Sequence, residues 1–340
     1  MMSDLIATPK SMKTVILKAI RSCLLEHGSA TKVELSNKLG FSFPTISKFL
    51  AQMEKDGELL VIGLDDSSGG RRATRYSYNP EYMLGLAIFI ESNGTHYTVF
   101  NCLGEVKKQG NTSSVLKNND LSLLTKRIQD IIAEYPGISS IAIGVPGSVD
   151  NGRIFYIPDY DHLQNFDLKG YYENLFSIPV VVENDMNAAV LGYFKSLGNT
   201  DNQSLVYLYF GQNGPGAGVL INGDVVRGRS FFSGEVSFVP QYEKQNFFQA
   251  LENRSAFLDD HTLDAVSRLV ATFVAIINPH MVIFCHGEVN EQVLEEIKKQ
   301  SSIYVPSEHL PELTESNWKQ DYLLGLQNLG LELMITKTNI

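Results

Sequence analysis

The sequence predicts an α/β protein that consists of a winged helix-turn-helix head and a two-lobed body. Three observations support this prediction. About forty residues into the chain, a short helix that ends in glycine precedes a helix with a serine cap, which is typical of a helix-turn-helix. Two β-rich runs with a glycine-rich tip follow, as in a wing. Beyond residue 81, apolar strands alternate with helices in the order strands, helix, strand, and this order occurs twice.

The charge of the chain is uneven. The net charge is −10, but residues 1–80 carry eleven Lys/Arg against eight Asp/Glu, which gives +3. The remaining residues carry seventeen against thirty, which gives −13. Phosphate repels an acidic body and tolerates a mildly basic head, so the asymmetry agrees with a DNA-binding domain at the N-terminus.

Length and composition indicate a globular protein of two or three domains, because 340 residues with 44% hydrophobic content can build sizeable cores. No apolar run is long enough to span a membrane, and residues 1–13 lack the apolar core of a signal peptide. We therefore expect a cytoplasmic protein that contacts no membrane. Cys23, Cys102 and Cys285 are scattered, so we expect buried thiols and no disulfide framework.

Two helices are expected at the start of the head. Apolar residues at three- and four-residue steps predict an amphipathic helix over residues 13–25, with Gly28 in the left-handed position beyond its end. Thr31 lies three residues before Glu34, which is the spacing of a capping box at the start of a second helix. Gly40 is expected to end that helix. Its predicted buried face consists of Val33, Leu35 and Leu39.

The third helix is the predicted recognition helix. Ser42 is suited to cap it, and Pro44 fits its first turn. Its predicted inward face, at steps of i, i+4 and i+7, consists of Ile46, Leu50 and Met53. Short hydroxyls and a cation on the other face suit base edges and phosphates in a major groove. The residues expected to contact DNA are Ser42, Phe43, Thr45, Ser47 and Lys48. An ordinary helical bundle with exposed hydroxyls is the alternative.

The wing is predicted from strands over residues 58–62 and 74–78. The tip between them ends in Arg71 and Arg72, which can reach the phosphates or the adjacent minor groove. A solvated loop with incidental charge is the alternative. With the recognition helix, the wing predicts that residues 1–80 form a domain that binds a double-stranded DNA operator.

Two α/β lobes are predicted for the body. We expect a first lobe over residues 81–190, completed by a C-terminal helix over residues 318–335. A second lobe is expected over residues 191–317, and we expect it to provide the dimerisation surface. Strand 84–90 is expected to form a hairpin with the strand that follows, with a turn at Gly94-Thr95.

Several segments of the body resemble the ROK family, which joins sugar-responsive repressors and sugar kinases. The matching segments are Gly144-Val145-Pro146-Gly147, Ile157-Pro158, Ile178 to Ala189, Gly211 to Gly218, Ile221 to Asp224 and Ser233 to Val236. The most specific of them contains Glu183-Asn184-Asp185, followed by Asn187. The resemblance runs from about residue 10 to the C-terminus, and the head is similar to the repressor branch. It implies an actin-like (ribonuclease-H-like) sugar-kinase fold for the body.

The resemblance also implies a sugar site. Asp185 matches the carboxylate that takes a proton from the sugar hydroxyl in the family's kinases, although the residue alone could equally cap the following helix. Asn184, Asp185 and Glu235 match positions that hydrogen-bond sugar hydroxyls. Asp159 stands where the family usually has Asn, and Leu163 where it often has Trp, so a different or charged sugar is possible. A vestigial cavity that binds nothing is the alternative.

The family's phosphate-binding parts are altered in this sequence. Ala87 takes the acidic position of the first phosphate loop, and Phe89 and Ile90 stand where glycines let phosphate approach. Pro215 removes a donor from the second loop, and Cys285-His286-Gly287 replaces a double glycine. Phosphoryl transfer depends on each phosphate contact, so we expect no kinase activity and a vestigial role for the catalytic carboxylate.

The family's zinc site is absent from the sequence. Phe238 takes the position of a histidine ligand, and residues 242–260 contain no cysteine. We therefore expect no metal and no other cofactor.

These features together predict a DNA-binding transcriptional regulator, expected to be a repressor, of carbohydrate genes. It is expected to respond to a sugar or sugar derivative in a degenerate kinase cleft. A homodimer or homotetramer is expected, because symmetric operators match an even number of heads. The alternatives are an active sugar kinase with a DNA-binding head, and a ligand-free regulator controlled by a protein partner.

Overall fold

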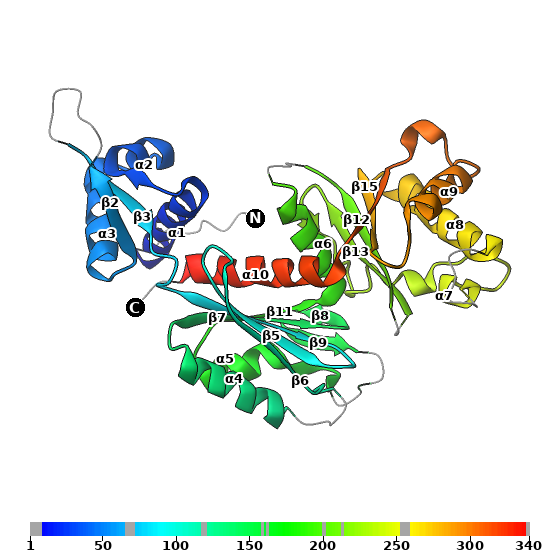
Figure 1. Ribbon diagram of the computed structural model, residues 1–340, viewed down its shortest axis with the longest axis horizontal. Helices are drawn as coiled ribbons and strands as arrows, with labels where there is room; N and C mark the ends of the chain where they lie inside the picture. Colours follow the sequence, from blue (N-terminus) through cyan, green and yellow to red (C-terminus); the bar gives the residue numbers. More distant parts are fainter. Residues whose placement is uncertain are drawn as a thin grey trace, which may run out of the picture.

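The computed structural model describes residues 9–64, 72–116, 121–157, 160, 163–198, 202–211, 214–251 and 259–337. Figure 1 shows a small head at one end, a helix-covered sheet in the middle and a second sheet with its own helices at the other end. This arrangement confirms the predicted α/β class with a head and a two-lobed body. Within the described residues, no helix combines the length and apolarity that crossing a bilayer would require.

In the described residues, the head contains three helices and a three-stranded sheet of order β1-β3-β2. Its elements are α1 (Pro9–His27), β1 (Ala30–Thr31), α2 (Lys32–Leu39), α3 (Phe43–Lys55), β2 (Leu59–Leu64) and β3 (Thr74–Tyr78). The predicted capping box is present, because Thr31 and Glu34 each bond the other's backbone N–H. Gly40 has a φ of 71° at the end of α2, and Ser42 caps α3. The local signals of the helix-turn-helix are therefore confirmed.

The predicted buried face of α2 is wrong at one position. Val33 is 52% exposed, whereas Leu35 is fully buried and Leu39 partly buried. Leu35 and Leu39 lie four residues apart and share a face, but Val33 lies about 200° from Leu35 around the helix. Val15 of α1 is likewise exposed, at 55%, because other apolar residues of that helix form its buried face.

The first lobe is built on a sheet of order β11-β7-β4-β5-β6, in which β4, β7 and β11 are parallel and β5 is antiparallel to both neighbours. Its strands are β4 (Leu84–Ile90), β5 (Thr95–Asn101), β6 (Val106–Thr112), β7 (Ile138–Val145) and β11 (Val180–Asn184). In Figure 1, α4 (Ser122–Glu134) and α5 (Leu168–Phe176) cover one face and α10 (Trp318–Thr336) covers the other. A small sheet beside it contains β8 (Ser148–Asp150), β9 (Arg153–Tyr156) and β10 (Phe166–Asp167).

The second lobe repeats the topology of the first. Its sheet has the order β14-β13-β12-β15-β16, so both lobes place their five strands in the spatial order third, second, first, fourth, fifth. The strands are β12 (Leu205–Gly211), β13 (Gly214–Ile221), β14 (Asp224–Val225), β15 (Met281–Cys285) and β16 (Glu312–Ser316). Its helices are α7 (Phe247–Ala250), α8 (Asp260–Ile276) and α9 (Glu291–Ser301), with short 3-10 turns at Val236–Phe238 and Ser307–His309.

Two helices, α6 (Asp185–Ser196) and α10, pack against each other between the lobes. A Cβ atom at Gly192 would lie 1.9 Å from the carbonyl oxygen of Asp321, and one at Gly325 would lie 1.9 Å from that of Ala188. Only glycine therefore permits this backbone approach. Since α6 also packs on strands of both sheets, the division of the body at residue 190 remains a prediction.

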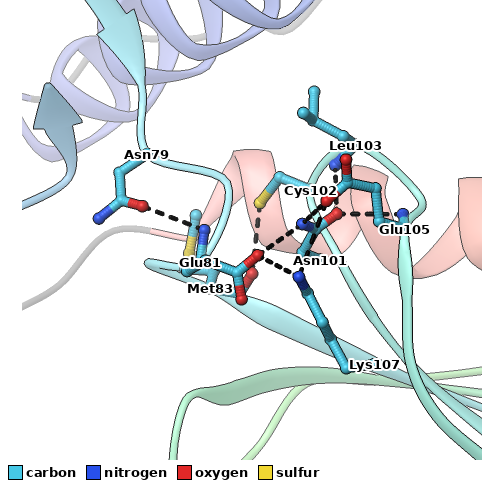
Figure 2. A network of polar contacts seen from close by, with 8 residues as sticks. All are labelled: Asn79, Glu81, Met83, Asn101, Cys102, Leu103, Glu105 and Lys107. Atoms are coloured by element: carbon cyan, nitrogen blue, oxygen red, sulfur yellow. Dashed lines mark hydrogen bonds and ion pairs between the residues drawn. The ribbon is translucent and has the colours of Figure 1, made fainter.

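The segment that joins the head to the body is held by polar contacts, which Figure 2 shows. The buried Asn101, at the end of β5, donates from Nδ2 to Oε1 of Glu81 over 2.8 Å. Lys107 pairs with the same oxygen at 2.5 Å, and the two contacts keep the pKa of Glu81 below its usual value. Cys102 bonds the carbonyl of Met83. The chain is thus fixed to the first lobe where it leaves the head.

Candidate functional site

A cavity of about 510 Å³ lies between the two lobes. The turn after β4, the loop after β7 and the N-terminus of α6 line it from one side. Strand β13 and a segment around residues 227–237 line it from the other, together with the N-terminus of α10. Three predicted sugar-site residues, Asn184, Asp185 and Glu235, line this cavity. The fourth, Asp159, lies outside the described residues.

Asn184 caps α6. Its Oδ1 accepts the N–H of Asn187 at 2.9 Å, and its Nδ2 donates to the carbonyl of Gly147 at 3.1 Å and to Oδ1 of Asp185 at 2.9 Å. The cap is therefore Asn184, and the alternative in which Asp185 caps the helix is wrong. Asn184 ties the start of α6 to the loop after β7 and so shapes the cavity wall.

Asp185 is the first residue of α6. Its Oδ1 also accepts the N–H of Met186 at 2.8 Å. Burial, together with the charges of Glu235 and Glu91, raises the pKa of the Asp185 carboxyl to about 7, against the effect of the Met186 N–H. Near neutral pH, this carboxyl can therefore either donate or accept a hydrogen bond to a ligand hydroxyl.

Two polar contacts cross from one lobe to the other beside the cavity. In the first contact, Glu235 forms a hydrogen bond with Ser148 of β8. Burial raises the pKa of Glu235, and this hydrogen bond lowers it. Arg227, which follows β14, forms an ion pair with the buried Glu183 of β11. These contacts join the two halves of the cavity wall and make it polar.

Replacing Asp185 with Asn is expected to stabilise the unliganded protein more at pH 8 than at pH 5. The pKa of Asp185 is raised to about 7 in the folded chain, so its contribution to stability is lost as pH rises from about 4 through 7. Asparagine keeps an acceptor oxygen without that cost. The melting temperature should rise by at least about 2 °C more at pH 8 than at pH 5. Equal changes at both pH values would contradict the assignment.

Bulky and acidic groups occupy the position of the first phosphate loop. The ring of Phe89 is buried, stacks on His96 at 4.7 Å and packs against Tyr322 at 5.2 Å. Glu91 lies at the following turn and lines the cavity. Its carboxylate is 3.2 Å from His96 and 3.7 Å from Lys319. Glu91 therefore places a negative charge at this corner of the cavity, while the ring of Phe89 is packed inside the protein.

Aromatic side chains from α10 form part of the cavity wall, which no pattern in the sequence indicated. Trp318 is the single tryptophan of the chain. It stacks on Tyr209 with ring centroids 4.7 Å apart and planes 2° apart, and it packs against Tyr322 at 5.4 Å. Glu288 also lines the cavity, and burial raises its pKa to about 7. No local motif marked these positions, because only the fold brings residues about a hundred apart together.

The predicted DNA-contact residues lie on the surface of the head. Ser42, Phe43 and Lys48 are exposed, and Thr45 and Ser47 are partly buried. The hydroxyl of Ser42 bonds that of Thr45 at 2.8 Å, so both serve the helix cap as well. Of the two wing arginines, Arg72 is exposed and Arg71 lies outside the described residues.

The three cysteines are buried, as predicted. In the part of the chain that the structure describes, no three His, Cys, Asp or Glu side chains cluster in a way that could hold a metal ion.

Comparisons with known proteins agree on one family. The model of the ROK family matches residues 93–240. The xylose repressor of Bacillus spizizenii is 28% identical over 238 residues, which cover 68% of this chain and 62% of that repressor. The DNA-binding transcriptional dual regulator NagC of Escherichia coli is 21% identical over 231 residues, covering 65% and 56%. The chain thus spans less than two thirds of the length of these relatives.

Solved structures show the same fold. A ROK family transcriptional regulator, a homologue of the Escherichia coli MLC protein, matches with a TM-score of 0.75 at 18% identity. The match covers 96% of this chain and 99% of the regulator, so it includes the head. A ROK family glucokinase from Streptomyces griseus, in complex with glucose and AMPPNP, matches 73% of this chain and 99% of the kinase, with a TM-score of 0.54 at 19% identity. The predicted actin-like sugar-kinase fold is confirmed.

Proposed function

The chain belongs to the ROK family, and from that premise we propose that it is a transcriptional regulator that binds operator DNA and releases or engages it in response to a sugar. One observation carries the proposal: a helix-turn-helix with an exposed recognition face and a polar cavity between two lobes belong to the same chain. The relatives named xylose repressor support regulation of carbohydrate genes as the role. We expect an even number of chains in the assembly, because operators with two half-sites require two heads.

The ligand we propose is an uncharged sugar. Among the described residues, four carboxylates line the cavity: Glu91, Asp185, Glu235 and Glu288. The cations there are partly neutralised, since Arg227 pairs with Glu183 and Lys319 lies near Glu91. Carboxylates accept hydrogen bonds from hydroxyls and repel phosphates, so the cavity favours a polyol over a sugar phosphate.

We propose further that the chain has no kinase activity. A triphosphate needs backbone N–H groups and cations around its oxygens. At the corresponding corner, Glu91 lines the cavity with a carboxylate, and its backbone N–H is already bonded to the carbonyl of Gly94. A coupled assay with Mg-ATP and D-xylose, D-glucose or N-acetylglucosamine tests this. Turnover that disappears in Asp185→Ala would establish the competing function, a sugar kinase with a DNA-binding head.

The regulatory function is tested with a DNA duplex enriched from a random library by the full-length chain. At least one of the three sugars is expected to change the affinity for this duplex at least tenfold, and glucose 6-phosphate is not. Asp185→Ala should abolish the sugar effect and leave DNA affinity within threefold, because Asp185 lines the cavity between the lobes, whereas the predicted DNA contacts lie on α3 and the wing. Asp150, exposed on β8, provides the control Asp150→Ala, which should respond like the wild type.

Two results would contradict the proposal. Failure to enrich any duplex would remove the DNA-binding function. DNA binding that no ligand alters would instead favour a regulator controlled by a protein partner.

A further inference from the structure

We propose that α10 transmits the state of the cavity to the DNA-binding head, and that Arg21 is the positioning residue that joins this helix to the head. The inference rests on the proposed function and adds the route by which the two sites communicate. Figure 1 shows α10 running from the second lobe, across the face of the first sheet, to the head. At 1.5 Å per residue, its 19 residues span about 28 Å.

The head contacts the C-terminal end of α10 through Arg21. This side chain extends from α1, is only 2% exposed, and donates from Nη1 to the carbonyl oxygens of Ile335, at 3.1 Å, and Lys337. The last carbonyls of a helix have no partner within the helix and carry its negative dipole end. The buried guanidinium donates hydrogen bonds to these carbonyls and places a positive charge at the negative end of the dipole. The head therefore stabilises the C-terminal end of α10.

A second buried charge fixes the orientation of that guanidinium. Glu58, at the base of the wing, is 3% exposed and accepts from Nε of Arg21 at 2.5 Å and from Nη2 at 3.2 Å. The planar fork of arginine can meet a carboxylate on one edge and carbonyls on another, which a lysine cannot do. Arg21 therefore links α1, the start of β2 and the end of α10.

The other end of α10 lies in the cavity. Trp318, Lys319 and Tyr322, all in its first two turns, line the cavity, and Trp318 stacks on Tyr209 of the second lobe. A ligand that moves β12 relative to the first lobe must act on this stack. The start of α10 is therefore placed to respond to a ligand held between Asp185 and Glu235.

The middle of α10 is packed tightly enough to move as one body with α6. The contacts at Gly192 and Gly325 bring the two backbones together without intervening side chains. Buried side chains of α1, including Ile20 and Leu24, belong to the same continuous core as Leu326 and Met334 of α10. Close-packed interiors transmit displacement rather than absorb it.

The head is attached to the body at a second place, the linker contacts of Glu81, Asn101 and Lys107 in Figure 2. These contacts hold the chain to the end of β5, whereas Arg21 holds the head to α10. A shift of α10 relative to β5 therefore tilts the head. In a dimer on DNA, such a tilt changes the spacing of two recognition helices.

Linkage gives a test that needs no sugar, because coupling between two sites is reciprocal. The single tryptophan, Trp318, reports the cavity by its fluorescence. Saturating the head with the enriched DNA duplex is expected to shift the Trp318 emission of the wild-type protein. The double variant Arg21→Met/Glu58→Met removes both buried charges and should bind the duplex within threefold, with at least four fifths of the shift lost.

The matched control is Arg75→Met. Arg75 also lies in the head, where it pairs with a glutamate, Glu34, at 2.9 Å and bonds the carbonyl of Ser29, but its side chain is 27% exposed. Its emission shift at saturation should equal that of the wild type. Loss of the shift in the control would mean that any change in the head perturbs Trp318 and would overturn the assignment to Arg21.

The outcomes separate this inference from the proposed function. DNA binding by anisotropy without any emission shift in the wild type would overturn the coupling and leave the regulator intact. If the double variant shows the full Trp318 emission shift on DNA binding, Arg21 does not couple the head to α10. If no duplex binds, the proposed function fails, and the coupling fails with it.

Hydrogen exchange keeps the test decisive if the double variant does not fold. In the wild type, the DNA duplex should slow amide exchange over residues 318–337 by at least threefold, while α9 is unchanged. Equal exchange with and without DNA along the whole of α10 would overturn the proposal.

Discussion

Alanine at position 325 is expected to destabilise the protein by about 3 kcal/mol, the upper end of the range for overpacked sites. The new Cβ would lie 1.9 Å from the carbonyl oxygen of Ala188, and neither backbone can yield without separating α6 from α10. Chemical denaturation of Gly325→Ala, with unfolding followed by circular dichroism, measures the loss. Because α6 carries Asp185, any sugar affinity should fall as well.

Gly137→Ala is the matched control for this substitution. Gly137 lies in the turn before β7, and the nearest atom to its added Cβ would be Cγ of Leu84, at 3.6 Å, which is an ordinary contact. Its free energy of unfolding should change by less than about 1 kcal/mol. Similar losses in the two variants would mean that the helix crossing does not depend on a missing side chain.

Reversing the charge at position 48 is expected to weaken operator binding at least tenfold. Lys48 is exposed on α3, and a lysine that contacts a phosphate releases one counterion when DNA binds. The plot of log affinity against log salt should therefore lose about one unit of slope in Lys48→Ala, and more in Lys48→Glu. Fluorescence anisotropy from 50 to 200 mM salt gives both values.

Lys55→Glu serves as the control on the same helix, because Lys55 is exposed in the last turn of α3, about 10 Å further along the helix axis than Lys48 and away from the N-terminal turns predicted to enter the groove. It should lower DNA affinity much less than Lys48→Glu. If the two reversals have equal effects, the head attracts DNA by net charge and α3 does not read the groove.

The sequence predicted those features whose signals are local. The Thr31–Glu34 box, the Ser42 cap and strand β4 each depend on residues within one short segment, so propensity and spacing were sufficient. The small sheet β8–β10 was missed, since strands of two to four residues are too short to show a periodicity. Val33 was misplaced because apolar character alone does not say which side of a helix is covered.

The candidate site was predicted only in part, for a related reason. Asn184, Asp185 and Glu235 stood in recognisable strings, and the structure brings them to one cavity. Trp318 and Arg21 carried no such mark. Arg21 appeared to be one cation on an amphipathic helix, and its partners lie 37 and more than 300 residues away along the chain. Burial that arises from distant segments is a property of the fold, which local patterns do not encode.

Phe89, which packs against His96 and Tyr322, affects how long the regulatory response to a sugar lasts. If the chain has no kinase activity, as proposed, a bound sugar is not converted into a product and leaves the cavity only by dissociation. On the proposed function, occupancy therefore follows the free concentration of the sugar in both directions, and gene expression can be restored as soon as the supply changes, without any product to clear.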